Sequence, residues 1–425
     1  MSARPRILAV MGSGETAPAM AKVHRALFDR FGGQVPAAII DTPYGFQENA
    51  DELSSRTLEF FATSVGNPVE VASFRSSDVD AVTAATALAR IRGASYVMAG
   101  PGSPSYALRQ WAGSPIPDAL ADKLMTGGIL TMASAAALTL GVVTIPVYEI
   151  YKVGEAPRWL PGLDLLGRTT GLRAAVVPHY DNAEGGNHDT RFCYMGERRL
   201  AMLEALLPDG AFVLGVDSHT ALLLDLEAGS ATVMGLGGVT VRVGGRSTRF
   251  ASGASIAIAA LGDAARGLAE GQSIEAVHTA ALAGSRSLER PARPAAPMRE
   301  QMQDLEGAFI AALDADQIHE AVAALLELDE AVEARIRAGE DSPDLDNASA
   351  TLRSLVVRLG EHAGADRGRS GDGLAPLVET LLELRDRARA AKDWPTADLI
   401  RDRMAAAGIE VRDGAEGSTW VVAGG

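Results

Sequence analysis

The sequence has almost no cysteine and no long apolar segment. Cys193 is the only cysteine in 425 residues, which excludes an internal disulfide and a zinc site built from several thiolates. No apolar run approaches the roughly 20 residues that a membrane-spanning helix requires. The five apolar residues of Ile7–Met11 are also too few for the apolar part of a signal peptide. We therefore expect a cytoplasmic protein.

The sequence also has fewer basic than acidic residues. The chain has 39 Lys and Arg against 54 Asp and Glu, a net charge of −15, which argues against broad, non-specific binding to nucleic acids or anionic membranes. At 425 residues the chain exceeds one ordinary hydrophobic core, so the length predicts two or three domains.

The first 284 residues alternate short apolar runs with amphipathic stretches. The apolar runs that predict buried strands are Arg6–Met11, Ala37–Asp41, Ser95–Gly100 and Gly128–Ala133. The stretches that predict helices are Ala17–Phe31, Asn49–Val65 and Asp78–Arg92. This alternation is typical of an α/β fold with a mostly parallel sheet. Three later runs, Ala211–Val216, Ala221–Leu226 and Ala231–Val243, predict antiparallel strands added at one edge.

The composition changes after this region. Residues 285–297, rich in Pro, Arg and Ser, predict a linker, and residues 298–363 carry helical apolar periodicity. Residues 364–373 predict a flexible loop, and residues 374–425 a last small domain with one or two helices and a short strand from Ile409 to Val411. We thus expect an N-terminal α/β domain, 1–284, followed by a small helical module.

The sharpest local motif is a strand followed by a serine and three alanines. In Ile129-Leu-Thr-Met-Ala-Ser-Ala-Ala-Ala-Leu, Ser134 stands where a strand turns abruptly into a helix, as a nucleophile does in many hydrolases. The N–H groups that open such a helix stabilise an oxyanion. A plain serine at a helix start is the competing interpretation, since Met132 and Ala136 replace the glycines that usually flank this serine.

Other strand ends carry residues of compatible chemistry. His179 follows Val176-Val-Pro and suits a general base for Ser134. The loops Met11-Gly-Ser-Gly and Ala99-Gly-Pro-Gly offer backbone N–H groups to an oxyanion or a substrate, from Gly12, Gly14, Gly100 and Gly102, together with that of Ala135.

Together these segments resemble the serine-peptidase family that contains cyanophycinase and aspartyl dipeptidase. The resemblance covers about residues 5–245 and includes Val177-Pro-His-Tyr and Leu214-Gly-Val-Asp-Ser-His-Thr-Ala-Leu. It implies a three-layer sandwich of the class I glutamine amidotransferase-like fold, with Ser134 as nucleophile and His179 as base. It also implies oxyanion donors at Gly102 and Ala135.

The chain departs from this family at the acid that should orient the histidine. Ser218 stands where the family often has a carboxylate, which leaves Asp217, Glu149 and Asp181 as candidates. We expect either an active serine hydrolase or a diverged, inactive binding domain. An amidotransferase subunit ranks lower, because this elbow lacks the nucleophilic cysteine of glutamine hydrolysis.

The remaining polar residues have plain interpretations that we prefer. A metal site at His179, His188 and Asp189 lacks helical ligand spacing, so we expect no metal and no cofactor. His219 suits a strand histidine, Asp41 a strand-end turn, and Cys193 an inert thiol. A last cluster, Tyr148, Tyr151 and Lys152, suits solvated surface, with Lys152 a possible contact for an acidic substrate group.

The end of the chain carries a basic helical stripe. Arg385, Arg389 and Lys392 follow helical spacing, and the apolar seam of this segment ends on two tryptophans. The residues that we assign to contact tRNA or a protein partner are Arg385, Arg389, Lys392, Trp394, Arg401 and Trp420. Residues 296–425 as a whole hold 14 Lys and Arg against 26 Asp and Glu, so local positive charge is confined to this stretch.

This segment resembles the extreme C-terminal domain of cysteinyl-tRNA synthetase. The resemblance rests on Arg-Ala-Arg-Ala-Ala-Lys-Asp-Trp, Ala-Asp-Leu-Ile-Arg and Gly-Ile-Glu-Val-Arg-Asp-Gly within residues 384–420, and extends more loosely back to residue 300 and that enzyme's anticodon-binding domain. It implies contact with tRNA. The chain has no His-Ile-Gly-His or Lys-Met-Ser-Lys-Ser motif, so it is not a functional synthetase.

Two hypotheses remain from the sequence. The first is a serine-type peptidase or amidohydrolase that acts on a small peptide, an amide or an aminoacyl ester. The second is a catalytically diverged protein of the same fold that binds tRNA or a protein partner through its C-terminal module.

Overall fold

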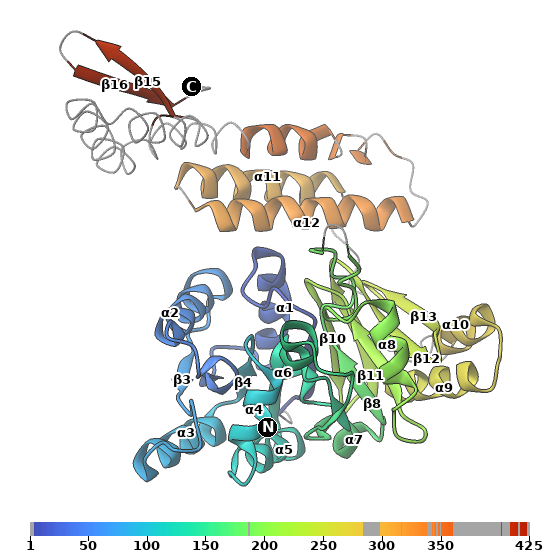
Figure 1. Ribbon diagram of the computed structural model, residues 1–425. Helices are drawn as coiled ribbons and strands as arrows, with labels where there is room; N and C mark the ends of the chain where they lie inside the picture. The colour runs from blue at the N-terminus through green and yellow to red at the C-terminus, as the bar shows by residue number, and fades with distance from the viewer. Residues whose placement is uncertain are drawn as a thin grey trace. The chain divides into compact units, whose positions relative to one another are not determined.

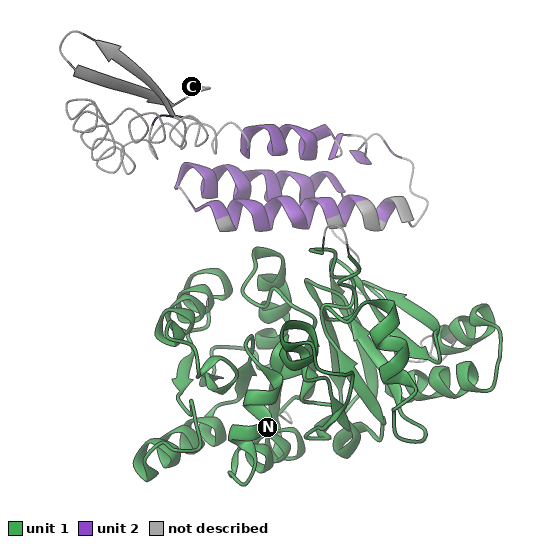
Figure 2. Cartoon of the chain, in the orientation of Figure 1, with its two compact units in different colours: residues 1–295 green, residues 296–425 purple. Residues whose placement is uncertain are grey.

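The computed structural model divides the chain into two compact units, residues 1–295 and 296–425 (Figure 2). The structure describes residues 4–185, 188–283, 298–315, 317–337, 342, 344–345, 347–348, 350–359, 401, 409–414 and 417–422. Within these residues no helix is both long and apolar enough to cross a membrane.

The first unit is built on an eight-stranded, mostly parallel sheet (Figure 1). Its strands are β1 (Arg6–Met11), β2 (Ala37–Ile40), β3 (Glu70–Ala72), β4 (Tyr96–Ala99), β5 (Gly128–Ala133), β10 (Thr220–Asp225), β11 (Ser230–Gly235) and β14 (Ser255–Ala257). Their spatial order is β14-β11-β10-β1-β5-β4-β2-β3. The five strands from β1 to β3 in this order are parallel, and the other three are antiparallel additions at one edge. The predicted α/β fold is therefore confirmed.

The central strands are apolar on both faces because both faces are covered. In β1, Leu8 and Val10 enter one apolar cluster, whereas Ile7, Ala9 and Met11 enter another on the opposite face. Successive side chains of a strand point to opposite faces, and a strand buried on both sides reads as a continuous apolar run. This explains why the strand is recognisable in the sequence although it lacks alternating polarity.

Helices cover the two faces and connect the parallel strands. They are α1 (Pro18–Asp29), η1 (Thr42–Tyr44), α2 (Ala50–Phe60), η2 (Phe61–Val65), α3 (Ala81–Gly93), α4 (Pro104–Trp111), α5 (Ile116–Thr126), α6 (Ala135–Leu138), η3 (Glu149–Val153), α7 (Leu165–Thr170), α8 (Gly196–Glu204), α9 (Ile258–Ala269) and α10 (Ile274–Ala283). Local chemistry fixes several starts. Asp80 accepts hydrogen bonds from the first N–H groups of α3, and Ser103 caps α4 just before Pro104.

A second sheet was not expected from the sequence. It contains β8 (Ala174–Val177), β9 (Phe212–Val216), β12 (Gly238–Val243) and β13 (Arg246–Ala251), in the order β13-β12-β9-β8. The prediction that all the later strands extend one edge of a single sheet is therefore wrong for β9 and β12. A smaller pair, β6 (Val143–Thr144) with β7 (Leu160–Pro161), stands beside the main elements.

The second sheet packs against one face of the first. Val176 of β8, Val216 of β9 and Val241 of β12 belong to the same apolar cluster as Leu8 and Val10 of β1. The opposite face of the second sheet packs on α8. This packing sets the end of β8 beside the end of β1, two strands that no local sequence pattern links.

The second unit contains a helical hairpin of α11 (Met298–Asp314) and α12 (Ile318–Arg337), whose apolar faces enclose Phe309 and Leu328. It also has a two-stranded sheet of β15 (Ile409–Gly414) and β16 (Gly417–Val422). The helices predicted within residues 298–363 are thus present where the structure describes them. The helices predicted within residues 374–408 lie outside the described residues, apart from Arg401.

Candidate active site

Ser134 stands in a strained turn between β5 and α6. Its backbone has φ 51° and ψ −119°, a conformation that costs a non-glycine residue about 1–3 kcal/mol and persists only where the surroundings enforce it. The N–H of Ser134 donates to the carbonyl of Met11 at 3.1 Å, and the N–H of Ala136 donates to the carbonyl of Gly100 at 3.2 Å. The turn is thus held from both neighbouring strands, β1 and β4.

The turn forms without the usual flanking glycines. Met132 is fully buried in the core between the sheets, and Ala135, Ala136 and Ala137 are buried beneath the turn. The methyl group of Ala136 fits because it packs within the same apolar cluster as Met132. Met132 and Ala136, which stand where the motif usually has glycine, thus do not prevent the strained turn at Ser134.

His179 reaches Ser134 from the second sheet. Its Nε2 lies 2.8 Å from the Ser134 hydroxyl oxygen, which is the distance of a nucleophile hydrogen-bonded to its general base. The N–H of His179 donates to the carbonyl of Gly12 at 3.3 Å, which ties the end of β8 to the loop after β1. The predicted pair is brought together, although its members come from different sheets.

Burial sets the protonation of this histidine. Desolvation lowers the pKa of His179, and the negative charges of Glu184 and Asp181 partly oppose that change. The imidazole is therefore neutral at neutral pH, as a base that accepts the serine proton must be.

An unusual backbone segment wraps around His179. Phe192, Cys193 and Tyr194 have φ values of 59°, 55° and 68° in succession, a left-handed run that is rare outside glycine. The N–H of Cys193 donates to the carbonyl of His179 at 3.1 Å. The Tyr194 ring lies 6.4 Å from the His179 ring, and its hydroxyl donates to Glu184 at 2.7 Å. Sequence reasoning missed this turn and Glu184, because nothing in the residue types requires the conformation.

The acids proposed to orient His179 do not contact it. Asp217 accepts from the N–H of Gly238 and from the Arg249 guanidinium, each at 2.8 Å, so it binds the second sheet together. Glu149 has a buried oxygen with no partner among the described residues. The structure therefore does not support the catalytic role that we assigned to these two carboxylates.

Asp181, the third candidate, acts at longer range. Its carboxylate accepts from the backbone N–H of Ser218 at 2.7 Å, and it influences His179 only through its charge. Across the described residues, no carboxylate is hydrogen-bonded to the His179 ring. Within the described residues, the contacting pair of Ser134 and His179, called the dyad below, therefore has no third, acidic member.

The predicted oxyanion donors fall into two groups. Within the described residues, the N–H groups of Gly102 and Ala135 have no hydrogen-bond acceptor, so both remain available. Gly102 has φ 134°, and a Cβ there would lie 1.9 Å from the carbonyl oxygen of Pro43, so only glycine allows this close approach. The Gly100 carbonyl accepts from the Ala136 N–H and helps to hold the elbow, while the role assigned to the Gly100 N–H stays a prediction.

Gly12 and Gly14 lie against the turn between β9 and β10, and the role assigned to the Gly14 N–H stays a prediction. The Gly12 N–H donates to the Thr220 carbonyl at 2.9 Å, so it is not free for an oxyanion as we had predicted. A Cβ at Gly12 would lie 1.9 Å from the Asp217 carbonyl oxygen, and one at Gly14 would lie 2.3 Å from the His219 ring. These glycines let the loop after β1 pass between the ends of β9 and β10.

Cys193 and Asp41 keep their plain interpretations, whereas His219 lies in the turn between β9 and β10 rather than in a strand, and its Nδ1 is buried without a partner among the described residues. Burial raises the pKa of Cys193 to about 12, which makes it an inert thiol. Asp41 accepts from Ser73 at 2.7 Å and from the Phe74 N–H at 2.8 Å, as expected of a strand-end turn. Asp189 pairs with Arg191 at 2.9 Å.

Three further residues lie near the His179 loop. His188 lies 3.4 Å from the Tyr151 hydroxyl, and Lys152 sits over the Tyr151 ring.

Among the described residues no group of three His, Cys, Asp or Glu side chains is arranged to hold a metal ion.

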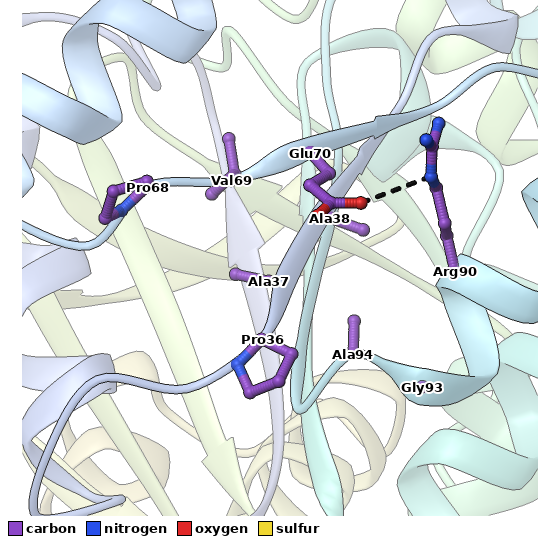
Figure 3. A pocket seen from close by; sticks show the side chains of 9 residues that line it. All are labelled: Pro36, Ala37, Ala38, Pro68, Val69, Glu70, Arg90, Gly93 and Ala94. Carbon is purple, nitrogen blue, oxygen red and sulfur yellow. Dashed lines mark ion pairs between the residues drawn. The ribbon is translucent and has the colours of Figure 1, made fainter.

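One pocket of about 360 Å³ lies elsewhere (Figure 3). It is lined by residues at the amino ends of β2 and β3 and by the end of α3 before β4, with Arg90 and Glu70 paired across it at 3.2 Å. These residues occupy the amino ends of parallel strands, whereas Ser134 follows the carboxyl end of β5. The pocket is therefore separate from the dyad.

Comparison with known proteins assigns the C-terminal region. Residues 371–420 match the sequence family described as the cysteinyl-tRNA ligase anticodon binding domain. Cysteine–tRNA ligase of Paenarthrobacter aurescens is 40% identical over 137 residues, which are 29% of this chain and 27% of that protein. The corresponding protein of Shewanella woodyi is 44% identical over 88 residues, 18% of each chain. The C-terminal region is therefore similar to the anticodon-binding domain of this family, and the chain spans less than a third of the length of these ligases.

The first unit has neighbours among solved structures. A peptidase from an acI-B1 Actinobacterium has a TM-score of 0.49 at 20% identity, over 60% of this chain and 97% of that one. A protein titled a putative peptidase E from Listeria monocytogenes EGD-e has a TM-score of 0.35 at 11% identity, over 58% and 98%. The fold assignment of the first unit rests on the strand order and pairing given above.

The residues assigned to tRNA or partner contact lie mostly outside the described residues. These are Arg385, Arg389, Lys392 and Trp394. Arg401 is described and exposed, and Trp420 lies in β16 opposite Val411.

Proposed function

We propose that the first unit is a serine hydrolase in which Ser134 attacks a carbonyl carbon and His179 accepts the serine proton. The observation that carries this proposal is the 2.8 Å contact between the two side chains, made by two residues that both hold a strained backbone. Strain of this kind clusters at active sites, where the surrounding structure maintains it.

The chemistry proceeds through an acyl-enzyme. The Ser134 oxygen bonds to the carbonyl carbon while its proton passes to Nε2 of His179, and the oxyanion accepts from the N–H groups of Gly102 and Ala135. Collapse breaks the bond to the leaving group, which takes the proton from His179. Water then repeats the sequence, the histidine receives and returns a second proton, and Ser134 is released.

The missing orienting acid bears on the substrate. A triad whose acid is disabled loses about 10⁴-fold in kcat against peptides, because the imidazole is neither held in the right tautomer nor stabilised when protonated. An ester has a better leaving group than an amide and demands less of the base. The dyad therefore suits ester substrates better than peptides.

The C-terminal region suggests which ester. Its relatives are ligases of tRNA and cysteine, and its matched domain is one that binds an anticodon. We propose that it brings an aminoacylated tRNA for cysteine, whose aminoacyl group is joined to the ribose by an ester, and that the first unit hydrolyses that ester.

The test is deacylation of charged tRNA. The full chain is incubated with tRNA for cysteine that carries a radiolabelled aminoacyl group, alongside Ser134→Ala. The proposal predicts loss of label with the wild type only. Deacylation that is equal in both proteins, or absent from both, would overturn it.

A diverged binding protein is the second candidate, favoured because no carboxylate among the described residues is hydrogen-bonded to His179. It predicts that Ser134→Ala binds charged tRNA as tightly as the wild type while neither protein releases the label. Gel shift on the same samples separates the two functions.

A further inference from the structure

A buried carboxylate without a cationic partner lies close to the dyad. Glu15, in the loop after β1, exposes 6% of its surface. Among the described residues, no ion pair and no hydrogen bond from another side chain reaches its carboxylate. Burying an unpaired carboxylate is costly, and burial accordingly raises the pKa of Glu15. A buried acid that is kept without a cation beside it is a candidate for binding a cationic group.

The place of this carboxylate follows from the strand order. Glu15 stands four residues beyond the end of β1, yet its Oε1 lies against Gly100 after β4, where an added Cβ would come within 2.9 Å of it. Strand β5 lies between β1 and β4, so the Glu15 side chain passes over the end of β5. That end carries Ser134, whose elbow is bonded to the same two strands.

The nearby cation and the other buried acid are already paired. The Arg75 guanidinium is bound by Asp41 and Asp51, and Asp41 also accepts from Ser73 and from the backbone of Phe74. Asp41 and Glu15 lie at the same end of the sheet, but among the described residues the Glu15 carboxyl group accepts only from its own backbone N–H and has no cationic partner. Its partner is therefore to be sought in the substrate.

We propose that Glu15 binds the primary ammonium group of the acyl part of the substrate. This deepens the function proposed above and rests on it. In an aminoacyl ester the ammonium is one carbon from the carbonyl that Ser134 attacks, so a carboxylate over the same strand end is well placed to pair with it. Such a charge-assisted hydrogen bond fixes the acyl group and excludes acyl groups whose nitrogen is blocked.

Binding is measured without turnover. In a Ser134→Ala protein, the affinities for L-alaninamide and L-cysteinamide are compared with those for their N-acetyl derivatives by saturation-transfer NMR. We expect the free amines to bind about tenfold or more tightly than the acetylated compounds, as for a hydrogen bond to a charged group. In the double variant Ser134→Ala/Glu15→Gln, both free amines should bind as weakly as their N-acetyl derivatives.

Glu15→Gln should not harm the fold. A neutral amide of the same shape removes a burial cost, so we expect the melting temperature to stay the same or to rise. Glu227→Gln, which changes an exposed carboxylate at the opposite end of the sheet, is the matched control and should keep the preference for free amines. A crystal of Ser134→Ala soaked with L-alaninamide supplies a second readout that needs no change at Glu15.

The outcomes separate the two proposals. An equal affinity for free and acetylated amides, no binding of the free amides, or a preference that survives Glu15→Gln would each overturn the role of Glu15. The hydrolase proposal fails in a different experiment, the deacylation assay, if the wild-type chain does not hydrolyse the ester of charged tRNA.

Discussion

The two sides of the Ser134–His179 contact are built in different ways. Ser134 ends an inner strand of the main sheet, and backbone hydrogen bonds from both flanking strands fix its turn. His179 ends the edge strand of the second sheet, and loop carbonyls and a left-handed segment hold it there. Ser134 is thus positioned by the sheet, whereas His179 is positioned by loops. Among the described residues no carboxylate is hydrogen-bonded to the His179 ring, while Ser134 and His179 lie 2.8 Å apart.

The largest effect on catalysis is expected from replacing Ser134, which the main sheet positions. Ser134→Ala should lower kcat/KM for ester hydrolysis by about 10³-fold or more, since the nucleophile is lost while substrate binding remains. Steady-state kinetics with an aminoacyl ethyl ester measures this. Ser255→Ala, on the edge strand β14, is the control and should behave as the wild type. Equal rates for Ser134→Ala and the control would refute nucleophilic catalysis at this elbow.

A substitution at Gly12, where the loop after β1 contacts His179, should have nearly as large an effect. Gly12→Ala places a Cβ 1.9 Å from the Asp217 carbonyl oxygen, at the residue that links β1 to His179 and to Thr220. We expect the free energy of unfolding to fall by about 1–3 kcal/mol or more and hydrolysis to fall with it. Urea denaturation measures the first effect.

The matched control for this substitution is Gly33→Ala, where an added Cβ meets nothing within 4 Å. It should leave both stability and rate unchanged. A Gly12→Ala protein as stable as Gly33→Ala would contradict the close approach described for this loop.

A substitution at Ser218, near His179, should raise kcat. The Ser218 N–H donates to the carboxylate of Asp181, two residues after His179, at 2.7 Å, so we place a longer acidic side chain at position 218 to bring a carboxylate near His179. Ser218→Glu should raise kcat about tenfold or more, because a carboxylate stabilises the imidazolium. Ser218→Gln separates charge from size. If the Glu and Gln variants have the same kcat, an orienting acid at this position is not what the dyad lacks.

Delivery of tRNA should be separable from both sides of the dyad. Reversing the charge at Arg385, Arg389 and Lys392 should weaken tRNA binding and reduce the slope of log affinity against log salt by up to about 0.9 per lost phosphate contact. Gel shifts over a salt series measure the slope. Hydrolysis of the aminoacyl ethyl ester should not change. Unaltered tRNA affinity would remove the basic stripe from the interface.

The smallest effect is a shift in pH dependence. The pKa of His179 is lowered by burial, so the acid limb of kcat/KM should lie below the ordinary histidine value of 6.5. Glu184 favours the charged ring, and Glu184→Gln should therefore lower the pKa of His179 further and move the limb to lower pH. The pH–rate profile tests this, with the exposed Glu155→Gln as control. A shift to higher pH would contradict the assigned direction.

Local patterns in the sequence predicted the nucleophile side well. The strands predicted at Arg6–Met11 and Gly128–Ala133 are present with those bounds, since residues buried on both faces leave an unmistakable apolar run. The pairing of Ser134 with His179 also followed from where apolar runs end, a position that strand ends share with functional loops.

The base side was harder to predict for physical reasons. Whether β8 and β9 join the first sheet or form a second depends on long-range packing of side chains such as Val176 and Val216, and no local spacing encodes it. The left-handed run at Phe192–Tyr194 is imposed by contacts with the His179 and Tyr180 backbone, against residue preference. Asp217 looked catalytic because its partner Arg249 lies 32 positions away in the sequence.

The most direct test is covalent labelling of the elbow serine. The full chain is treated with a fluorophosphonate, digested, and analysed by mass spectrometry, in parallel with Ser134→Ala and His179→Ala. A nucleophile activated by its histidine predicts a single adduct on the peptide that contains Ser134, greatly slowed in His179→Ala and absent from Ser134→Ala. An unmodified Ser134 in the wild type, or an adduct that forms equally fast without His179, would contradict the dyad.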